Sequence, residues 1–176
     1  MSELRKIFRS ASTSNAEVSE LLQAIFVAES IIPSEEIWLV SPWLTDLEIL
    51  DNRSAAFSAV GHQWGARRIR LTELLSTALE SSRLFVVTRP DRHNDTFIQK
   101  LRDLADAAGT SENLTIRIRE TLHIKGLLGQ DYYLSGSMNF TFNGVEIHDE
   151  GIDLDTSPDS IAQARIAFHE HYGEEQ

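Results

Sequence analysis

The chain has 176 residues, 41% of them hydrophobic, no cysteine and a formal net charge of −11. This length and composition suit one domain with a hydrophobic core, and the missing cysteine excludes disulfides, thiolate nucleophiles and thiolate metal sites. The sequence contains neither an apolar run of about 18 residues nor an apolar signal core, so we expect a cytoplasmic protein without membrane association.

Apolar residues recur in patterns that predict alternating helices and strands. Helices are expected at residues 14–30, 71–82, 95–108 and 157–172, from apolar residues at helical spacing and from capping residues. Strands are expected at residues 37–41, 83–88, 113–119, 122–128, 132–135 and 151–155. Residues 1–34 would form an N-terminal helical segment, and residues 46–70 an irregular insertion with room for one short helix. The alternation predicts a single α/β domain over residues 1–176, with a mixed sheet and helices on both faces.

Positive charge is unevenly distributed along this acidic chain. It gathers in two groups, Arg67, Arg68 and Arg70, and Arg83, Arg89 and Arg92. Each group is either an ordinary solvated surface or a rim that binds anions. Of the three tryptophans, Trp64 stands beside the first group and is therefore the candidate for stacking on a base, whereas core or loop packing is expected of the others.

Polar residues with the chemistry of a phosphate site cluster between positions 123 and 139. His123 and Lys125 are two apart on a predicted strand, so they project from the same face. An unpaired lysine is costly to bury, and the pair is better suited to a face that meets an anion. The following strand ends in Gly136-Ser137-Met138-Asn139, where the glycine permits a close approach of the backbone and two polar side chains can donate to the same anion.

This pattern resembles the motif of the phospholipase D superfamily, in which His-x-Lys is followed by an Asp and then by Gly-Ser-x-Asn. The matching positions are His123, Lys125, Gly136, Ser137 and Asn139. The wider resemblance covers most of residues 36–172. It implies a phospholipase D-like fold and a nucleophilic histidine that forms a phosphohistidine intermediate. It also implies that Glu150, which is similar to a downstream Glu of the family, orients a catalytic histidine.

The chain departs from the family pattern at one position and carries the motif once. Gln130 stands where the family has its Asp, and Asp131 follows it. Either the turn is tightened and Asp131 takes a shifted role, or the function of this Asp is absent. Small single-motif members pair two chains, so the resemblance implies a homodimer in which His123 of each chain meets one phosphate. More narrowly, the chain resembles components of bacterial clusters that insert and restrict 7-deazaguanine bases in DNA.

The leading hypothesis is a metal-independent phosphodiesterase, a DNA-directed nuclease of a bacterial modification or defence system. The expected catalytic residues are His123, Lys125, Ser137, Asn139 and Glu150. The expected substrate-binding residues are Gly136, Arg67, Arg68, Arg70 and Trp64. No metal or cofactor is expected, and the expected partners are a second copy of the chain, DNA and other proteins of that system.

Two other functions stay open. One is a catalytically weak or inactive subunit that binds DNA or serves as a scaffold in a defence complex, which the shifted Asp and the acidic charge favour. The other is a hydrolase of phospholipids or small phosphodiesters, which the lack of a basic amphipathic helix disfavours. A metal site at His169 and His171 is also disfavoured, because residues two apart on a helix face different directions.

Overall fold

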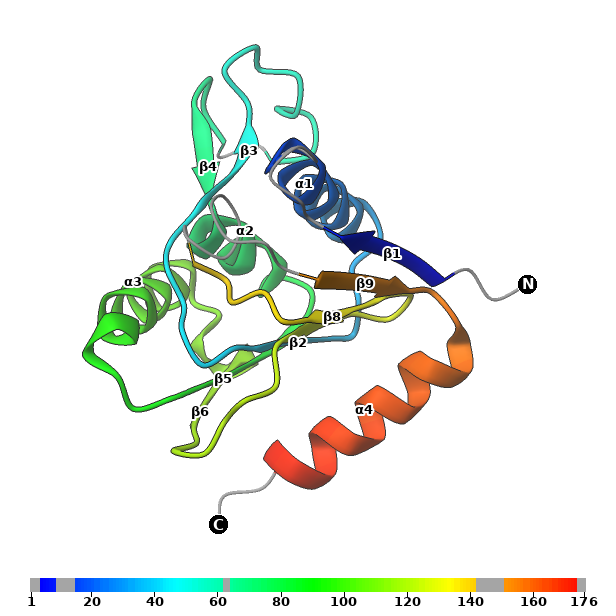
Figure 1. Ribbon diagram of the computed structural model, residues 1–176. Coiled ribbons are helices and arrows are strands. Elements are labelled where there is room, and N and C mark those ends of the chain that lie inside the picture. Colours follow the sequence, from blue (N-terminus) through cyan, green and yellow to red (C-terminus); the bar gives the residue numbers. More distant parts are fainter. Residues whose placement is uncertain (1–3, 9–14, 62–63, 142–150, 174–176) are drawn as a thin grey trace.

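The computed structural model describes residues 4–8, 15–61, 64–141 and 151–173. Seven strands form its main sheet: β1 (Leu4–Phe8), β2 (Glu36–Val40), β5 (Arg83–Thr88), β6 (Leu114–Ile118), β7 (Gly126–Leu128), β8 (Tyr133–Gly136) and β9 (Gly151–Asp155). Their order across the sheet is β1-β9-β8-β7-β2-β5-β6. The sheet is mixed and has helices on both faces (Figure 1), which confirms the predicted α/β architecture.

Strand direction determines which loops meet. β2, β5 and β6 are parallel, β7 is antiparallel to β2, and β8 is antiparallel to β7. The strand β8 therefore points the same way as β2. Val40 at the end of β2 lies opposite Gly126 at the start of β7, and Gly126 in turn faces Ser135 near the end of β8. The segments that follow β2, β5 and β8 and the segment that precedes β7 consequently lie along one edge of the sheet.

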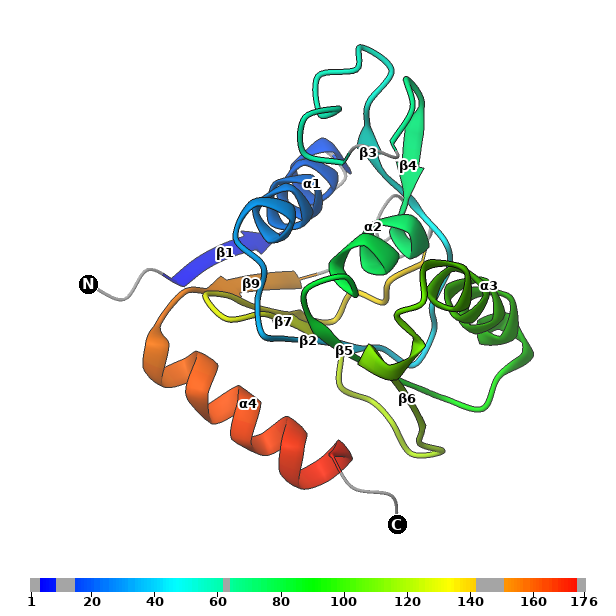
Figure 2. The same ribbon diagram turned by 180° about the vertical axis from the view of Figure 1, so that it is seen from behind.

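Within the described ranges, four helices cover the sheet: α1 (Asn15–Ile31), α2 (Leu71–Ala78), α3 (Arg92–Ala108) and α4 (Pro158–Tyr172). A short 3₁₀ turn, η1 (Ser111–Asn113), follows α3. The first three lie on one face and α4 lies alone on the other, as the two opposite views show (Figures 1 and 2). In the part of the chain that is described, no helix is both long and apolar enough to cross a membrane.

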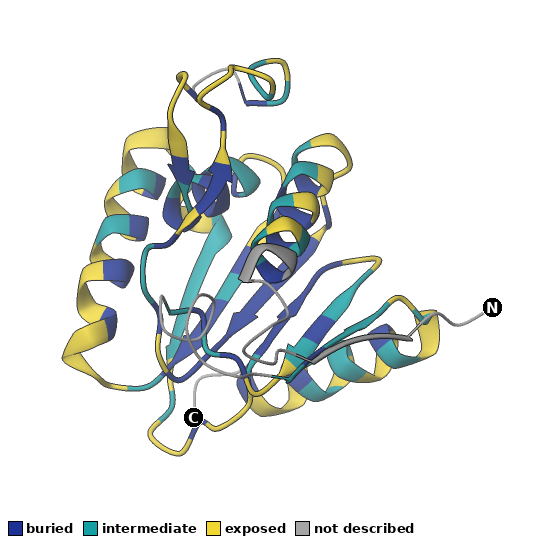
Figure 3. Cartoon of the chain, turned by 45° about the horizontal axis from the view of Figure 1, so that its top comes forward, coloured by how far each residue is buried: buried dark blue, intermediate teal, exposed yellow. Residues whose placement is uncertain are grey.

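The two faces of β2 point into two separate hydrophobic clusters. Ile37 and Leu39 belong to the larger cluster, which α1, α2 and α3 cover, whereas Trp38 and Val40 belong to the smaller one beneath α4. Buried residues occupy the central strands and the inward faces of the helices (Figure 3). Because both faces are covered, every residue of β2 is buried, and its sequence is an unbroken apolar run rather than an alternating pattern.

Capping residues mark both ends of α3 and the start of α4, although α3 begins at Arg92 rather than at the predicted residue 95. The Asp91 side chain accepts a hydrogen bond from the backbone N–H of His93 and so caps the start of α3. Gly109, with a φ of +70°, ends the same helix in the left-handed conformation. Pro158 is the first residue of α4 and follows Ser157, as predicted.

Three segments differ from the prediction. The strand β1 lies within the segment predicted to be helical, because it pairs with β9. A second, two-stranded sheet of β3 (Glu48–Asp51) and β4 (Arg68–Arg70) lies in the insertion predicted to be irregular, and the described residues of that insertion include no helix. The strand β7 begins at Gly126 rather than near residue 122, so His123 and Lys125 precede the paired residues.

Candidate active site

Polar residues from four segments lie along the edge where β2, β5 and β8 end and β7 begins. Residues 41–43 follow β2, Arg89 follows β5, His123 and Lys125 precede β7, and Ser137 and Asn139 follow β8. In open α/β sheets, ligands bind outside the carboxyl ends of the parallel strands. This edge is the candidate active site, and it includes every predicted catalytic residue except Glu150, which lies outside the described residues.

His123 is exposed and makes its side-chain contact with an arginine. Arg89 Nη2 lies 3.2 Å from Nδ1 and 3.3 Å from Nε2 of His123. A donor at nearly equal distance from both ring nitrogens lies over the face of the ring rather than in line with either lone pair. Lys125 is half-buried, and its Nζ donates to the carbonyl oxygen of His123 at 2.8 Å. Two cationic side chains therefore both touch His123.

The Gly136-to-Asn139 segment is held by the neighbouring backbone. Gly136 has a φ of +144°, and a Cβ at this position would lie 2.0 Å from the carbonyl oxygen of Gly151. The next residue, Ser137, donates its backbone N–H to that same carbonyl at 3.0 Å, and its hydroxyl accepts from the N–H of Gly151 at 3.1 Å. The glycine is thus required by the close approach of β9.

Asn139 is tied to the end of β2 through Ser41. The Ser41 hydroxyl donates to the Trp43 carbonyl oxygen at 2.8 Å and lies 3.5 Å from Asn139 Oδ1. It also accepts from the N–H of Phe140 at 3.3 Å. These contacts direct the carboxamide oxygen of Asn139 toward Ser41, and they hold the segment after β8 against the segment after β2.

Asn94, a fully buried residue of α3, joins the loops that follow β2 and β5. Its Nδ2 donates to the carbonyl oxygens of Pro42 at 2.9 Å and Arg89 at 3.0 Å, and to Thr88 Oγ1 at 2.8 Å. Its Oδ1 accepts from the N–H of Leu44 at 2.8 Å. A buried network of this kind fixes a single backbone arrangement, so Arg89 extends from a rigid loop.

Trp43 and Asp91 form the outer wall of the site beside Arg89. The guanidinium carbon of Arg89 lies 5.5 Å from the Trp43 ring centroid, within the range of a cation–π contact. The backbone N–H of His93 and the indole N–H of Trp43 both donate to Asp91 and hold the pKa of its carboxyl below the ordinary value. Asp91 is therefore ionised at neutral pH, and the hydrogen bond that it accepts fixes the orientation of the Trp43 indole.

Gln130 and Asp131 lie at the other end of the β7–β8 hairpin, because β7 runs away from His123 toward their turn. The N–H of Gln130 donates to Ser34 Oγ at 2.7 Å, and Asp131 is exposed. Both residues line a pocket of about 610 Å³ at the opposite edge of the sheet, together with Glu36, Arg165 and His169. The departure from the family pattern is therefore remote from the candidate active site.

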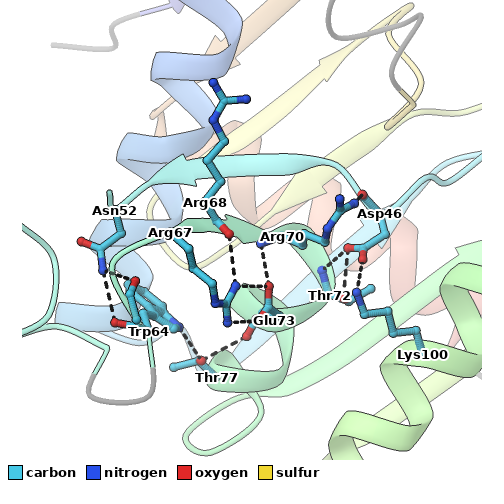
Figure 4. Close-up of polar contacts among 11 residues, drawn as sticks. Asp46, Asn52, Trp64, Arg67, Arg68, Arg70, Thr72, Glu73, Thr77 and Lys100 are labelled. Atoms are coloured by element: carbon cyan, nitrogen blue, oxygen red, sulfur yellow. Dashed lines mark hydrogen bonds and ion pairs between the residues drawn. The ribbon is translucent and has the colours of Figure 1, made fainter. Parts of the chain in front are cut away.

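The arginines predicted to bind substrate lie around the β3–β4 hairpin, away from this edge. Arg67 pairs with Glu73 (Figure 4), while Arg68 and Arg70 both pair with Glu48. All three side chains are about half exposed, at 49, 53 and 43%. The structure places them in local ion pairs on the surface of the hairpin.

Trp64, predicted to stack on a base, is instead part of the core. It is 3% exposed, and its indole N–H donates to Thr77 Oγ1 at 3.3 Å (Figure 4). Its carbonyl oxygen accepts from the buried Asn52 side chain at 3.2 Å. A buried ring has no free face on which a base could stack. The position of Trp64 close to Arg67 in the sequence therefore misled the prediction.

Arg89 and Asn94 lie at the site and were not predicted as functional, although Arg89 belonged to a noted group. Arg89 was one of the second group of arginines, but Arg83 of that group pairs with Glu36 at the far edge and Arg92 is an exposed residue of α3. The sequence does not distinguish these three arginines, and only the fold shows that Arg89 is the one at the site. The sequence gives no signal for Asn94, because two of its partners, Pro42 and Leu44, are about 50 residues away along the chain.

No family model matches the sequence, and no curated protein matches it. Solved structures do match. Nuc from Salmonella typhimurium, described as a phospholipase D family member, superposes with a TM-score of 0.61 over 100% of this chain and 97% of its own, at 12% identity. NucT from Helicobacter pylori gives a TM-score of 0.57 over 96% of this chain and 95% of its own, at 11% identity.

TrmBL2, an archaeal chromatin protein described as having a novel mode of DNA binding, also has a TM-score of 0.57. The superposition covers 99% of this chain and 54% of TrmBL2, at 10% identity. At such low identities these likenesses concern the fold alone. The mixed sheet, the helices on both faces and the nearly complete coverage of Nuc and NucT together show that the chain has the phospholipase D-like fold.

Proposed function

We propose that this protein is a metal-independent phosphodiesterase that cleaves DNA through a phosphohistidine intermediate. The observation that carries the proposal is the register of the β7–β8 hairpin, in which Gly126 faces Ser135. If this antiparallel register is continued by one position, Lys125 lies opposite Gly136. An imidazole and an ammonium group therefore lie next to the segment that supplies Ser137 and Asn139, which is the donor set that a phosphodiester needs.

In the proposed reaction, a ring nitrogen of His123 attacks phosphorus and forms a P–N bond while the P–O bond to the leaving group breaks. Lys125 and the amide and hydroxyl groups of Asn139 and Ser137 hold the non-bridging oxygens. A water molecule then attacks the phosphohistidine, the P–N bond breaks, and His123 is regenerated. Glu150 is proposed to orient a histidine in these steps.

The leaving oxygen needs a proton, and one chain carries a single copy of the motif. We propose that the chain works as a homodimer and that the partner's His123 donates this proton and later accepts one from the attacking water. A two-fold axis through the site makes the two histidines equivalent in the free dimer. Bound substrate then determines which of them is the nucleophile.

DNA is the proposed substrate, in a bacterial system that modifies and restricts DNA with 7-deazaguanine bases. Arg67, Arg68 and Arg70 are proposed to follow the DNA backbone, and half of each side chain is free to do so. Phosphates would then replace Glu48 and Glu73 as their partners. Such binding releases counterions and weakens as the salt concentration rises.

The test is hydrolysis by purified protein in the presence of EDTA. Substrates are single- and double-stranded DNA, DNA with and without 7-deazaguanine bases, and bis(p-nitrophenyl) phosphate. His123→Ala should lower the rate by about a thousandfold or more, because it removes the nucleophile. His171→Ala, which changes an exposed histidine of α4, is the matched control and should keep the wild-type rate. Cleavage that requires a divalent metal would contradict the mechanism.

A DNA-binding or scaffold subunit without turnover is the second candidate. It is favoured by Gln130 at the position of the family's Asp and by the likeness in fold to TrmBL2. DNA retention by both the wild type and His123→Ala, with no hydrolysis of any of these substrates, would select this function over the phosphodiesterase.

A further inference from the structure

We propose that Arg89 is a phosphate-binding residue of this site, and that in the free protein its guanidinium rests against the ring of the nucleophile. The inference rests on the proposed function, because it assigns Arg89 a role in that reaction. It concerns a residue outside the motif from His123 to Asn139.

The first observation is the contact itself. A single guanidinium nitrogen, Nη2, lies within 3.3 Å of both ring nitrogens of His123. A donor at nearly equal distance from both ring nitrogens lies over the face of the imidazole, beside the nitrogen that would attack phosphorus. Arg89 therefore holds a positive charge next to the place where a phosphodiester bound for attack by His123 would lie.

The second observation is the charge balance of Arg89. The arginines of the β3–β4 hairpin have carboxylate partners, and so do Arg53, Arg83 and Arg165. Among the described residues, no carboxylate lies within ion-pair distance of Arg89. Its guanidinium packs instead against the Trp43 ring, and its Nε is buried with no hydrogen-bond partner in the described part of the chain. An unsatisfied group of this kind at a site calls for a ligand.

The third observation is the rigidity of the loop. Asn94 holds the Arg89 carbonyl oxygen and the loop after β2 in one buried network. The backbone of Arg89 is therefore fixed, and only the end of the side chain has to move. An incoming phosphodiester offers non-bridging oxygens, to which a guanidinium binds more strongly than to a neutral imidazole. When Arg89 turns to the phosphate, it neutralises charge on the substrate and moves away from the His123 ring.

Phosphate binding separates this role from a structural one, and inorganic phosphate is the probe. The ¹H NMR signal of His123 Cε1–H, identified as the one missing from His123→Ala, reports binding at low salt. Arg89→Met should weaken phosphate binding by about tenfold or more, the effect of losing a charge-assisted hydrogen bond. It should also shift the His123 signal in the absence of phosphate. Arg89→Lys keeps the charge but not the planar fork, and should bind with intermediate affinity.

Arg92→Met is the matched control, because it removes an equal charge from an exposed residue three positions away. It should leave both the phosphate affinity and the His123 signal unchanged. The inference is overturned if Arg89→Met binds phosphate as the wild type does, or if Arg92→Met loses as much affinity as Arg89→Met. This outcome is independent of turnover: phosphate binding lost with Arg89 but no hydrolysis supports this inference while it contradicts catalysis.

Discussion

Gly136 is a residue of the motif whose importance can be tested without any substrate. It combines a φ of +144° with a position at which a Cβ would meet the Gly151 carbonyl oxygen at 2.0 Å. Gly136→Ala should therefore lower the free energy of unfolding by about 3 kcal/mol or more, since backbone strain and overpacking add together. Urea denaturation followed by circular dichroism gives this number.

Gly109→Ala is the control for the part of the lost unfolding free energy that comes from the positive φ angle alone. Gly109 has a φ of +70° but no atom within 4 Å of the position of a Cβ. Its replacement should cost only about 1–2 kcal/mol, which is the penalty of a left-handed residue. Equal losses at the two positions would contradict the close approach of β9 to Gly136.

At the residue scale, the sequence identified the groups whose chemistry is evident from residue type and spacing. His123, Lys125, Ser137 and Asn139 lie at one edge because a hairpin, which is a local structure, brings them there. Arg89 and Asn94 could not be assigned in this way. Arg89 meets His123 across 34 residues, and Asn94 meets Leu44 across 50 residues. Contacts of this range depend on the parallel pairing of β2 with β5, which apolar periodicity does not specify.

At the scale of elements, Glu36 connects α4 to the sheet. It begins β2 with 7% exposure, it is paired with Arg83, and its Oε2 accepts from His169 Nε2 at 2.7 Å. Arg165 lies 3.8 Å away on the same helix as His169. Burial alone would raise the pKa of Glu36, but the hydrogen bond from His169 and the charges of His169, Arg83 and Arg165 outweigh it and hold the pKa below its ordinary value of 4.5.

Because this pKa is lowered on folding, the ionised Glu36 stabilises the protein above the unfolded-state pKa, and the contribution is lost as the pH falls through the folded value. Glu36→Gln should be less stable than the wild type by about 1–2 kcal/mol near pH 5. This difference should shrink toward about pH 3, as Glu36 takes up its proton. Thermal or urea unfolding at both pH values measures it.

The neighbouring change Glu35→Gln provides the comparison, because Glu35 is exposed at the same edge of the sheet. The free energy of unfolding of Glu35→Gln should equal that of the wild type at both pH values. A difference between wild type and Glu36→Gln that is as large at pH 3 as at pH 5 would mean that the charge of Glu36 does not stabilise the docking of α4.

Elements with a clear local signal, either an apolar pattern or a capping pair, were predicted best. The strands β5 and β9 were found at their predicted residues, and α4 was found with its predicted start and end. The β3–β4 sheet was missed, because each strand is short and their pairing joins Leu50 to Ile69 across the turn-rich part of the insertion. β1 was missed for a similar reason: its strand character comes from pairing with β9 at the other end of the chain.

At the scale of the whole molecule, the proposed homodimer makes a quantitative prediction about mixtures. If one site needs His123 from both chains, unfolding and refolding the wild type together with His123→Ala should give activity that falls as the square of the wild-type fraction. In an equal mixture, only about a quarter of the dimers carry both histidines. Rates of bis(p-nitrophenyl) phosphate hydrolysis across a series of mixing ratios measure this curve.

Mixtures of the wild type with His171→Ala, refolded in the same way, should keep full activity at every ratio. A linear decline with His123→Ala would mean that each chain turns over its substrate alone. Sedimentation equilibrium on the same samples determines the oligomeric state independently of activity.

The strand order has a consequence for synthesis of the chain on the ribosome. β2, β5 and β6 with their helices are made before β7, yet β7 is the strand that covers the remaining edge of β2. Until Gly126–Leu128 has emerged, the nascent chain displays an open edge whose residues are all buried in the finished protein. Such an edge invites pairing with other chains. The β7–β8 hairpin completes the candidate active site. It therefore also covers the open edge of β2, at which an incompletely synthesised chain would aggregate.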